Sequence, residues 1–289
     1  MSLVEQAISR LKNQSDPKVK SAPARLKVPA PVNRDTTAGT ASNRLNIDLE
    51  ALRARGYLPE VEQDRRFAEH YRRIKRPLIE KAVAGTDVGE ARVIMVASAV
   101  PGDGKTFTSI NLALSMALER DMSVLLVDSD VAKQHITGIF GLSRQPGLLD
   151  ALQDDTVDPE SLVIPTNIRG LSLLPAGSRA EGAAELLSSN RMLSIAENLC
   201  AVNTGRILLL DSPPLLITNE GRALLKIAGQ VILVVRASST PRQAVQAAIR
   251  LIDVRQAGGL ILNDVTTASS DEYYGYGKYG AYGQAPDGS

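Results

Sequence analysis

The chain has 289 residues, of which 44% are hydrophobic and 22% charged, and its formal net charge is +1. A balance this close to neutral excludes the strong electrostatic bias of nucleic-acid-binding proteins, so we expect no nucleic acid among its partners. No apolar run approaches the ~20 residues of a membrane-spanning helix, and the N-terminus lacks a signal-peptide pattern. The single cysteine excludes an intramolecular disulfide. We therefore expect a soluble protein of the cytoplasm.

The N-terminal segment is expected to lie apart from a globular domain. Residues 1–12 place apolar side chains at helical spacing, which predicts a short amphipathic helix. Residues 13–60 begin with a stretch rich in Pro, Ala, Ser, Thr and Lys, and we assign them to a flexible linker. The domain should then span residues 61–264. It opens with a charged helix over residues 61–83, in which Pro77 predicts a break or a kink.

From Arg92 onward, short continuous apolar segments alternate with helical patterns. Strands are predicted at residues 92–99, 123–130, 171–177, 206–214, 230–237 and 258–264. Helices are predicted at residues 106–120, 191–202 and 241–256. Apolar strands that alternate with helices are typical of an α/β fold, in which helices cover both faces of a mostly parallel sheet.

The first predicted strand leads into a phosphate-binding sequence. Residues 99–106 read AVPGDGKT, which matches the P-loop pattern G-x-x-x-x-G-K-[ST] except that Ala99 replaces the first glycine. Small residues let backbone N–H groups face phosphate oxygens, and the following helix N-terminus favours anions. Lys105 is expected to reach the β- and γ-phosphates of ATP, and Thr106 to place its hydroxyl on Mg²⁺. Nucleotide contacts are assigned to Ala99, Pro101, Gly102, Asp103, Gly104, Lys105, Thr106 and Phe107.

Two later strands end in carboxylates. The apolar run VLLV is followed by Asp128 and Asp130, and the run ILLL is followed by Asp211. Because ligands of an open parallel sheet bind at the carboxyl ends of its strands, we expect these side chains to converge on the phosphate loop. There they can ligate Mg²⁺ directly or through water, and we assign the metal shell to Thr106, Asp130 and Asp211. For Asp130 alone, a helix N-cap is an equally ordinary interpretation.

These motifs resemble those of the bacterial tyrosine kinases. The sequence Asp128-x-Asp130 is similar to their Walker A′ motif, and Asp211-Ser-Pro-Pro to their Walker B motif. The resemblance covers about residues 65–289 and is closest to the tyrosine autokinases encoded beside exosortase and exopolysaccharide genes. It implies an ATP-dependent protein-tyrosine kinase with Lys105, Asp128 and Asp130 as catalytic residues. In this scheme Asp128 accepts the tyrosine proton.

Asn263, at the end of the last predicted strand, is a candidate for contacting adenine, and capping the tail is its alternative role. Residues 265–289 are rich in Gly and Tyr and are predicted to be disordered. The resemblance implies that the tail tyrosines are phosphoacceptors, whereas without a nucleotide site they would predict only a low-complexity adhesive tail. The candidate phosphoacceptors are Tyr273, Tyr274, Tyr276, Tyr279 and Tyr282.

The resemblance also implies partners. Glu69, Arg72 and Lys75 resemble an E-x-x-R-x-x-R helix through which such kinases form homo-oligomers, with Lys75 in place of the second Arg. Lysine cannot make the bidentate contact of arginine, and a solvated charged helix is the alternative. The family further implies a transmembrane chain-length-determinant (polysaccharide co-polymerase) protein as activator. The chain would then work at the inner face of the plasma membrane, in exopolysaccharide synthesis and export.

Two other functions are consistent with a P-loop. A ParA/MinD-type ATPase switch shares the predicted sheet, but that class carries a signature lysine where this chain has Val100 and has no use for a tyrosine-rich tail. A non-catalytic adaptor that binds nucleotide to hold its shape is the second alternative, although Lys105, Thr106 and all three carboxylates are present. A dinucleotide-binding domain is disfavoured because no G-x-G-x-x-G follows the first strand.

Overall fold

The computed structural model describes residues 44–84 and 91–265. These residues belong to one compact unit of the chain. The predicted helix over residues 1–12, the linker before residue 44 and the five tail tyrosines lie outside the described residues.

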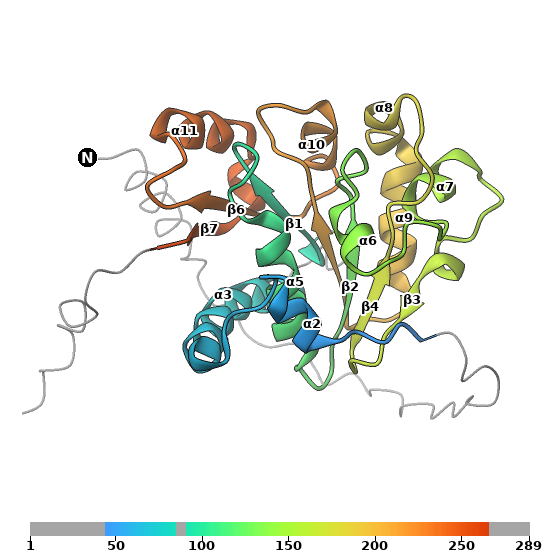
Figure 1. The fold of residues 1–289 in the computed structure, drawn as a ribbon. Helices are drawn as coiled ribbons and strands as arrows, with labels where there is room; N and C mark the ends of the chain where they lie inside the picture. The colour runs from blue at the N-terminus through green and yellow to red at the C-terminus, as the bar shows by residue number, and fades with distance from the viewer. Residues whose placement is uncertain (1–43, 85–90, 266–289) are drawn as a thin grey trace, which may run out of the picture. The chain divides into compact units, whose positions relative to one another are not determined.

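Within the described residues, seven strands form one sheet in the order β3-β4-β2-β5-β1-β6-β7 (Figure 1). The strands are β1 (Val93–Ser98), β2 (Ser123–Asp128), β3 (Ile164–Pro165), β4 (Leu171–Leu174), β5 (Arg206–Asp211), β6 (Gln230–Arg236) and β7 (Ala257–Asn263). All neighbouring strands pair in parallel except β3 and β4, which are antiparallel. The predicted mostly parallel α/β fold is confirmed. The two-residue strand β3 was not predicted, because it is too short to show a pattern.

Helices cover both faces of the sheet. The helices are α2 (Leu49–Ala54), α3 (Asp64–Ala84), α5 (Lys105–Ala117), α6 (His135–Ile139), α7 (Leu148–Gln153), α8 (Ala183–Leu187), α9 (Asn190–Ala201), α10 (Asn219–Leu224) and α11 (Arg242–Leu251). Single 3₁₀ turns occur at Val61–Gln63, Pro159–Leu162 and Val254–Gln256. None of the helices in the described ranges combines the length and apolar character needed to cross a bilayer.

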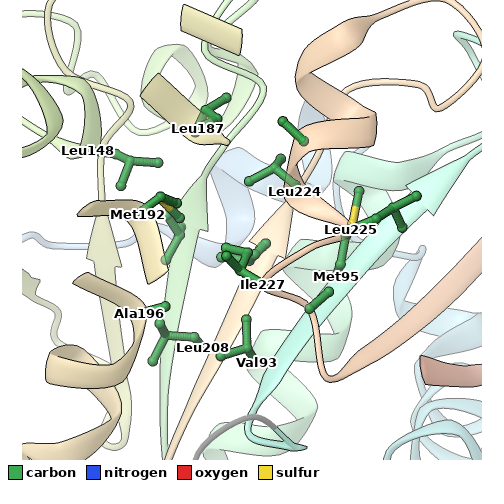
Figure 2. Packing of buried hydrophobic residues seen from close by; sticks show 14 of the residues in the cluster. Val93, Met95, Leu148, Leu187, Met192, Ala196, Leu208, Leu224, Leu225 and Ile227 are labelled. Carbon is green, nitrogen blue, oxygen red and sulfur yellow. The ribbon is translucent and has the colours of Figure 1, made fainter. Parts of the chain in front are cut away.

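Two hydrophobic cores lie on opposite faces of the sheet. Along β1, Val93 and Met95 belong to one cluster, whereas Ile94 and Val96 belong to the other, because successive side chains of a strand point to opposite faces. Figure 2 shows the first cluster, in which side chains of α8, α9 and α10 meet β1 and β5. The second cluster is filled from α2, α3, α5 and α6. Both faces of the central strands are therefore buried, which explains their continuous apolar sequences.

The predicted linker ends earlier than expected. Residues 44–60, which we had assigned to it, contain α2 and contribute Ile47 and Leu52 to the second core cluster. Leu45 forms a bridge with Thr166 next to β3. These few apolar residues carry no visible periodicity, and only their contacts with distant parts of the chain order them.

Of the break or kink predicted at Pro77, the break is wrong, since α3 continues through this residue to Ala84. Residues on both sides of Pro77 are anchored, because Tyr71, Leu78 and Ala82 are buried in the second core cluster and α3 packs against α5. Tertiary packing outweighs the local cost of a proline within a helix.

Candidate active site

The phosphate loop lies between β1 and α5 and has an unusual backbone. Gly102 and Gly104 have φ angles of 88° and 94°, in the left-handed region that favours glycine. Among the described residues, the N–H groups of Gly102, Asp103 and Gly104 donate no hydrogen bond, and no side chain caps the N-terminus of α5. Free N–H groups at the start of a 13-residue helix form a site for an anion. The loop therefore has the geometry expected for binding phosphate.

Alanine at the first position of the loop has a structural explanation. Ala99 is fully buried and its methyl group belongs to the first core cluster. The residue thus contributes packing where a glycine would leave a gap.

Lys105 is a buried cation without a carboxylate partner. Its side chain is mostly buried, and Nζ donates a hydrogen bond to Ser98 Oγ at 3.0 Å. Among the described residues no carboxylate lies within ion-pair distance of this nitrogen. Burial lowers the pKa of Lys105, and Asp211, Asp130 and Asp103 partly oppose this effect. An anion bound at the phosphate loop would relieve the cost of this buried charge.

Asp211 lies beside the loop and is held by two hydroxyl groups of α5. Thr106 Oγ1 donates to Asp211 Oδ2 at 2.8 Å, and Ser109 Oγ donates to Asp211 Oδ1 at 2.9 Å. Burial raises the pKa of Asp211 to about 6, and these hydrogen bonds, together with the Lys105 charge, work in the opposite direction. Two residues of the predicted metal shell, Thr106 and Asp211, therefore lie within hydrogen-bond distance of each other.

Asp128 stands opposite Asp211 in the register of β2 and β5 but faces a different element. Its Oδ2 accepts hydrogen bonds from Thr137 N at 2.8 Å and Thr137 Oγ1 at 2.6 Å, whereas Oδ1 has no partner among the described residues. Burial is the main cause that raises the pKa of Asp128 to about 7. One oxygen of this fully buried carboxyl is thus fixed by α6, and the other is left unpaired.

Asp130 is buried as well and accepts a hydrogen bond from Lys133 N at 3.3 Å, which is a turn-capping contact. The described residues contain no group of three or more His, Cys, Asp or Glu side chains arranged to hold a metal ion. The metal shell predicted from the sequence has two carboxylates, Asp130 and Asp211, together with the hydroxyl of Thr106. Mg²⁺ in nucleotide sites is usually held by one or two carboxylates together with phosphates and waters, and the Thr106–Asp211 pair fits this pattern.

The side chain of Asp103 turns away from the nucleotide region predicted for it. It is buried, with Oδ1 accepting from Thr240 Oγ1 at 2.6 Å and Oδ2 lying 3.4 Å from Val100 N. Asn263 Nδ2 donates to the backbone oxygen of Asp103 at 3.0 Å. Asp103 can therefore contribute backbone atoms to a ligand, while its carboxylate shapes the loop.

A cavity of about 830 Å³ adjoins the phosphate loop. Its walls come from the loop and α5, the first half of α3, and the end of β7. Phe67 and Phe107 both line this cavity. Their rings pack edge to face, with centroids 6.2 Å apart. The lining residues include Gly102, Gly104, Phe107, Asn263, Arg66 and His70. A second cavity of about 770 Å³, lined by Arg92 and Glu119 among others, contains none of the predicted site residues.

The three residues of the predicted oligomerisation motif differ in their exposure to solvent. Glu69 and Arg72 are exposed on α3, but Lys75 is buried and its Nζ pairs with Glu119 at 2.7 Å. Lys75 is therefore not available for a contact with a second copy, and its place in the motif is corrected. A lysine with its charge satisfied inside the fold cannot substitute for an exposed arginine.

The sequence interpretation missed several polar residues of the site. Ser109 follows Thr106 by three positions and so lies on the same helix face, a spacing that could have revealed it. Thr137 and Thr240 come from segments far along the chain, and no local pattern indicates their contacts with Asp128 and Asp103.

Comparisons with known proteins agree with this geometry. Residues 91–259 match the family described as "AAA domain". The chain is 32% identical over 212 residues to the tyrosine-protein kinase YwqD of Bacillus subtilis. This alignment covers 73% of the chain and 86% of YwqD. It is 30% identical over 182 residues to the tyrosine-protein kinase ptk of Acinetobacter johnsonii, which covers 62% of this chain. The matched part is 24% of the length of that relative, so much of the Acinetobacter protein has no counterpart in the match.

A solved structure supports the same assignment. The kinase domain of VpsO is 29% identical to the chain, with a TM-score of 0.57, and the match covers 72% of this chain and all of that domain. The P-loop, the strand-end carboxylates and these similarities point to one group of proteins. The chain belongs to the family of bacterial tyrosine-protein kinases.

Proposed function

We propose that the chain is an ATP-dependent protein-tyrosine kinase that phosphorylates its own C-terminal tyrosine cluster. The observation that carries this proposal is the buried Lys105 at the phosphate loop. In the part of the chain that the structure describes, Lys105 has no carboxylate partner, and the N–H groups of Gly102, Asp103 and Gly104 donate no hydrogen bond. The Thr106–Asp211 pair beside it supplies the oxygen atoms that a Mg²⁺–nucleotide complex requires. Tyr273, Tyr274, Tyr276, Tyr279 and Tyr282 are the proposed acceptors.

In the proposed reaction, the phenol oxygen of a tail tyrosine attacks the γ-phosphorus of ATP. An O–P bond forms while the bond between the γ-phosphorus and the β–γ bridging oxygen breaks, which gives phosphotyrosine and ADP. Lys105 and the loop N–H groups stabilise the charge on the phosphates. Mg²⁺, when bound, adds further charge neutralisation, and Thr106, Asp130 and Asp211 are the residues that would hold it. Asp130 acts electrostatically on both Lys105 and Asp211, which supports its place in this set.

The phenol proton needs an acceptor, for which we propose Asp128. Its unpaired Oδ1 is the free oxygen, and a pKa raised to about 7 suits a group that takes up a proton near neutral pH. Because Asp128 is fully buried, this role requires the segment after β2 to shift when the substrate enters. For adenine we propose the cavity beside the phosphate loop, with Phe107 and Asn263 in its wall.

The proposed context follows from the family. We propose that a transmembrane chain-length-determinant protein activates the chain at the inner face of the plasma membrane, and that the kinase regulates exopolysaccharide synthesis and export. Relatives such as the Acinetobacter protein are about four times longer than the matched region, which supports a kinase that works with further segments or a partner. For the homo-oligomer we retain Glu69 and Arg72, which are exposed, and drop Lys75.

The test is autophosphorylation with labelled ATP and Mg²⁺. Wild type is compared with Lys105→Met and with a variant in which all five tail tyrosines are phenylalanine, which keeps the length and aromatic content of the tail. We expect tyrosine label on wild type only, with ATP binding retained by the phenylalanine variant. A wild type that hydrolyses ATP without labelling its tail, also in the presence of the partner's cytoplasmic segment, would favour the ParA/MinD-type switch instead.

A further inference from the structure

A carboxylate within a phosphate-binding loop needs an explanation. Asp103 lies between the two left-handed glycines, where a negative charge would repel phosphate if it faced the ligand. The structure buries this side chain until only 2% of its surface is exposed. The side chain of Asp103 therefore acts through the contacts that it makes inside the fold.

The first contact reaches the segment between β6 and α11. Thr240 Oγ1 donates to Asp103 Oδ1 at 2.6 Å and accepts from Arg236 N at 2.9 Å. Since the hydroxyl oxygen receives one hydrogen bond from the backbone, its own hydrogen is directed toward the carboxylate. A short hydrogen bond to an ionised acceptor is among the stronger ones in proteins. Thr240 therefore holds the Asp103 side chain from the β6 end.

The second contact comes from the end of β7. Asn263 Nδ2 donates to the backbone oxygen of Asp103 at 3.0 Å, and Ala237 N donates to the backbone oxygen of Asn263 at 2.8 Å. A Cβ atom at Gly104 would lie 2.0 Å from Asn263 Nδ2, so the amide sits directly against the loop. Together, Thr240, Asp103 and Asn263 form what we call the loop latch.

The loop latch holds the side chain and the backbone oxygen of Asp103, while the N–H groups of Gly102, Asp103 and Gly104 have no acceptor among the residues that the structure describes. We propose that Thr240 and Asn263 are positioning residues for the kinase, which through Asp103 hold the phosphate loop in the conformation that binds the triphosphate of ATP. This inference rests on the proposed function for its ligand. Neither residue needs to touch the reacting atoms for this role.

The test measures equilibrium binding of Mg²⁺–ATP to the full chain by calorimetry. Thr240→Val removes the hydroxyl but keeps the shape, and we expect about a tenfold weaker Kd, the size of one charge-assisted hydrogen bond. Thr240→Ser restores the hydroxyl and should bind within about twofold of wild type. The matched control is Thr166→Val, since Thr166 is also buried and donates to Leu171 O at 2.9 Å, beside β3 and β4 at the opposite edge of the sheet. This control should leave Kd unchanged.

A second variant guards against a Thr240→Val protein that does not fold. Asn263→Leu removes the donor to Asp103, and inorganic triphosphate serves as a probe that has no base. The loop latch predicts that this variant weakens triphosphate as much as ATP, whereas an adenine contact alone would weaken only ATP.

The possible outcomes separate the two proposals. If wild type binds Mg²⁺–ATP and Thr240→Val binds it equally well, the loop latch is wrong and the proposed kinase function stands. If both Val variants weaken binding alike, the effect reflects general stability and the positioning role is lost. If wild type itself binds no nucleotide, the latch and the proposed function both fail.

Discussion

Two buried lysines in this molecule have similar exposure and opposite surroundings. Lys75 and Lys105 are 6% and 8% exposed, and each lies on a helix that packs on the same face of the sheet. Lys75 pairs with Glu119 and also donates to the backbone oxygen of Ser115. Among the described residues, the only hydrogen-bond partner of the Lys105 ammonium group is the hydroxyl of Ser98. The carboxylate of Glu119 compensates the buried charge of Lys75, whereas the buried charge of Lys105 lacks such a partner and favours binding of an anion.

Replacing Lys105 or Lys75 singly by methionine should have opposite effects on tyrosine transfer and on the free energy of unfolding. This contrast is the largest effect that we expect. Lys105→Met should lower tyrosine transfer by about a thousandfold, the scale of losing a main stabiliser of transition-state charge. Its free energy of unfolding should not fall, because an unpaired buried charge is removed. Lys75→Met should keep transfer and cost about 2 kcal/mol of stability, since a charged hydrogen bond and an ion pair are lost. For both variants, urea unfolding measures the free energy of unfolding and labelled ATP measures tyrosine transfer. We call the expected opposite pattern the crossover.

The crossover would be refuted by a Lys105→Met protein that is less stable than wild type by as much as Lys75→Met. In that case Lys105 would have a structural role in the nucleotide-free state, and the contrast between the two lysines would disappear.

The buried carboxyls of the Lys105 region extend the comparison to pH. The pKa values of Asp211 and Asp128 are raised from 3.8 to about 6 and about 7. Between these limits the folded state binds more protons than the unfolded chain, so the stability of the nucleotide-free protein should fall as pH rises from about 4 through 7. Between pH 5 and pH 8 the loss is about 4 kcal/mol, since about one pKa unit of Asp211 and two of Asp128 fall in this range, each worth about 1.4 kcal/mol. Unfolding at pH 5 and pH 8 with a chelator measures it, and Asp128→Asn should flatten the slope. An unchanged slope in that variant would count against the assignment.

The smallest effect is expected at the surface of α3. Arg76 and Glu80 form an exposed pair at 3.0 Å, with side chains 81% and 65% exposed. Solvent screens such a pair, so Glu80→Ala should change the free energy of unfolding by no more than about 0.5 kcal/mol. The same chemical denaturation that reports on Lys75→Met measures it. If Glu80→Ala lowered the free energy of unfolding as much as Lys75→Met, burial would not decide the strength of ion pairs on this helix.

The parts of the molecule that sequence predicted well are those governed by local patterns. The β1 and β5 strands were found because both of their faces are buried and their sequences are continuously apolar. The phosphate loop and Thr106 could be predicted because a fixed spacing of residue types encodes a backbone conformation, and Gly102 and Gly104 have the left-handed φ angles that such a loop needs. Asp211 could be predicted to lie near Thr106 because a carboxylate directly follows an apolar strand.

The remainder depends on contacts between distant residues. The partner of Lys75 lies beyond the next strand along the chain, so its burial could not be read from α3 alone. Likewise, the hydrogen bond from Thr240 to the side chain of Asp103 joins residues 137 positions apart, so no local pattern in the loop could predict it. Residues 44–60 looked like linker because their few apolar side chains gain partners only in the folded domain.

The early segment before α2 has a consequence for synthesis on the ribosome. Leu45 N donates to Pro165 O, and Ile47 N donates to Asn167 Oδ1, a residue 120 positions later. At ~5–20 residues per second, translation reaches these partners roughly 6–24 s after Ile47 is made. During that interval the backbone N–H groups of Leu45 and Ile47 lack their native acceptors. The segment before α2 therefore cannot complete its native hydrogen bonds until the chain has been made past β3, and β1 gains its neighbours β5 and β6 only later still.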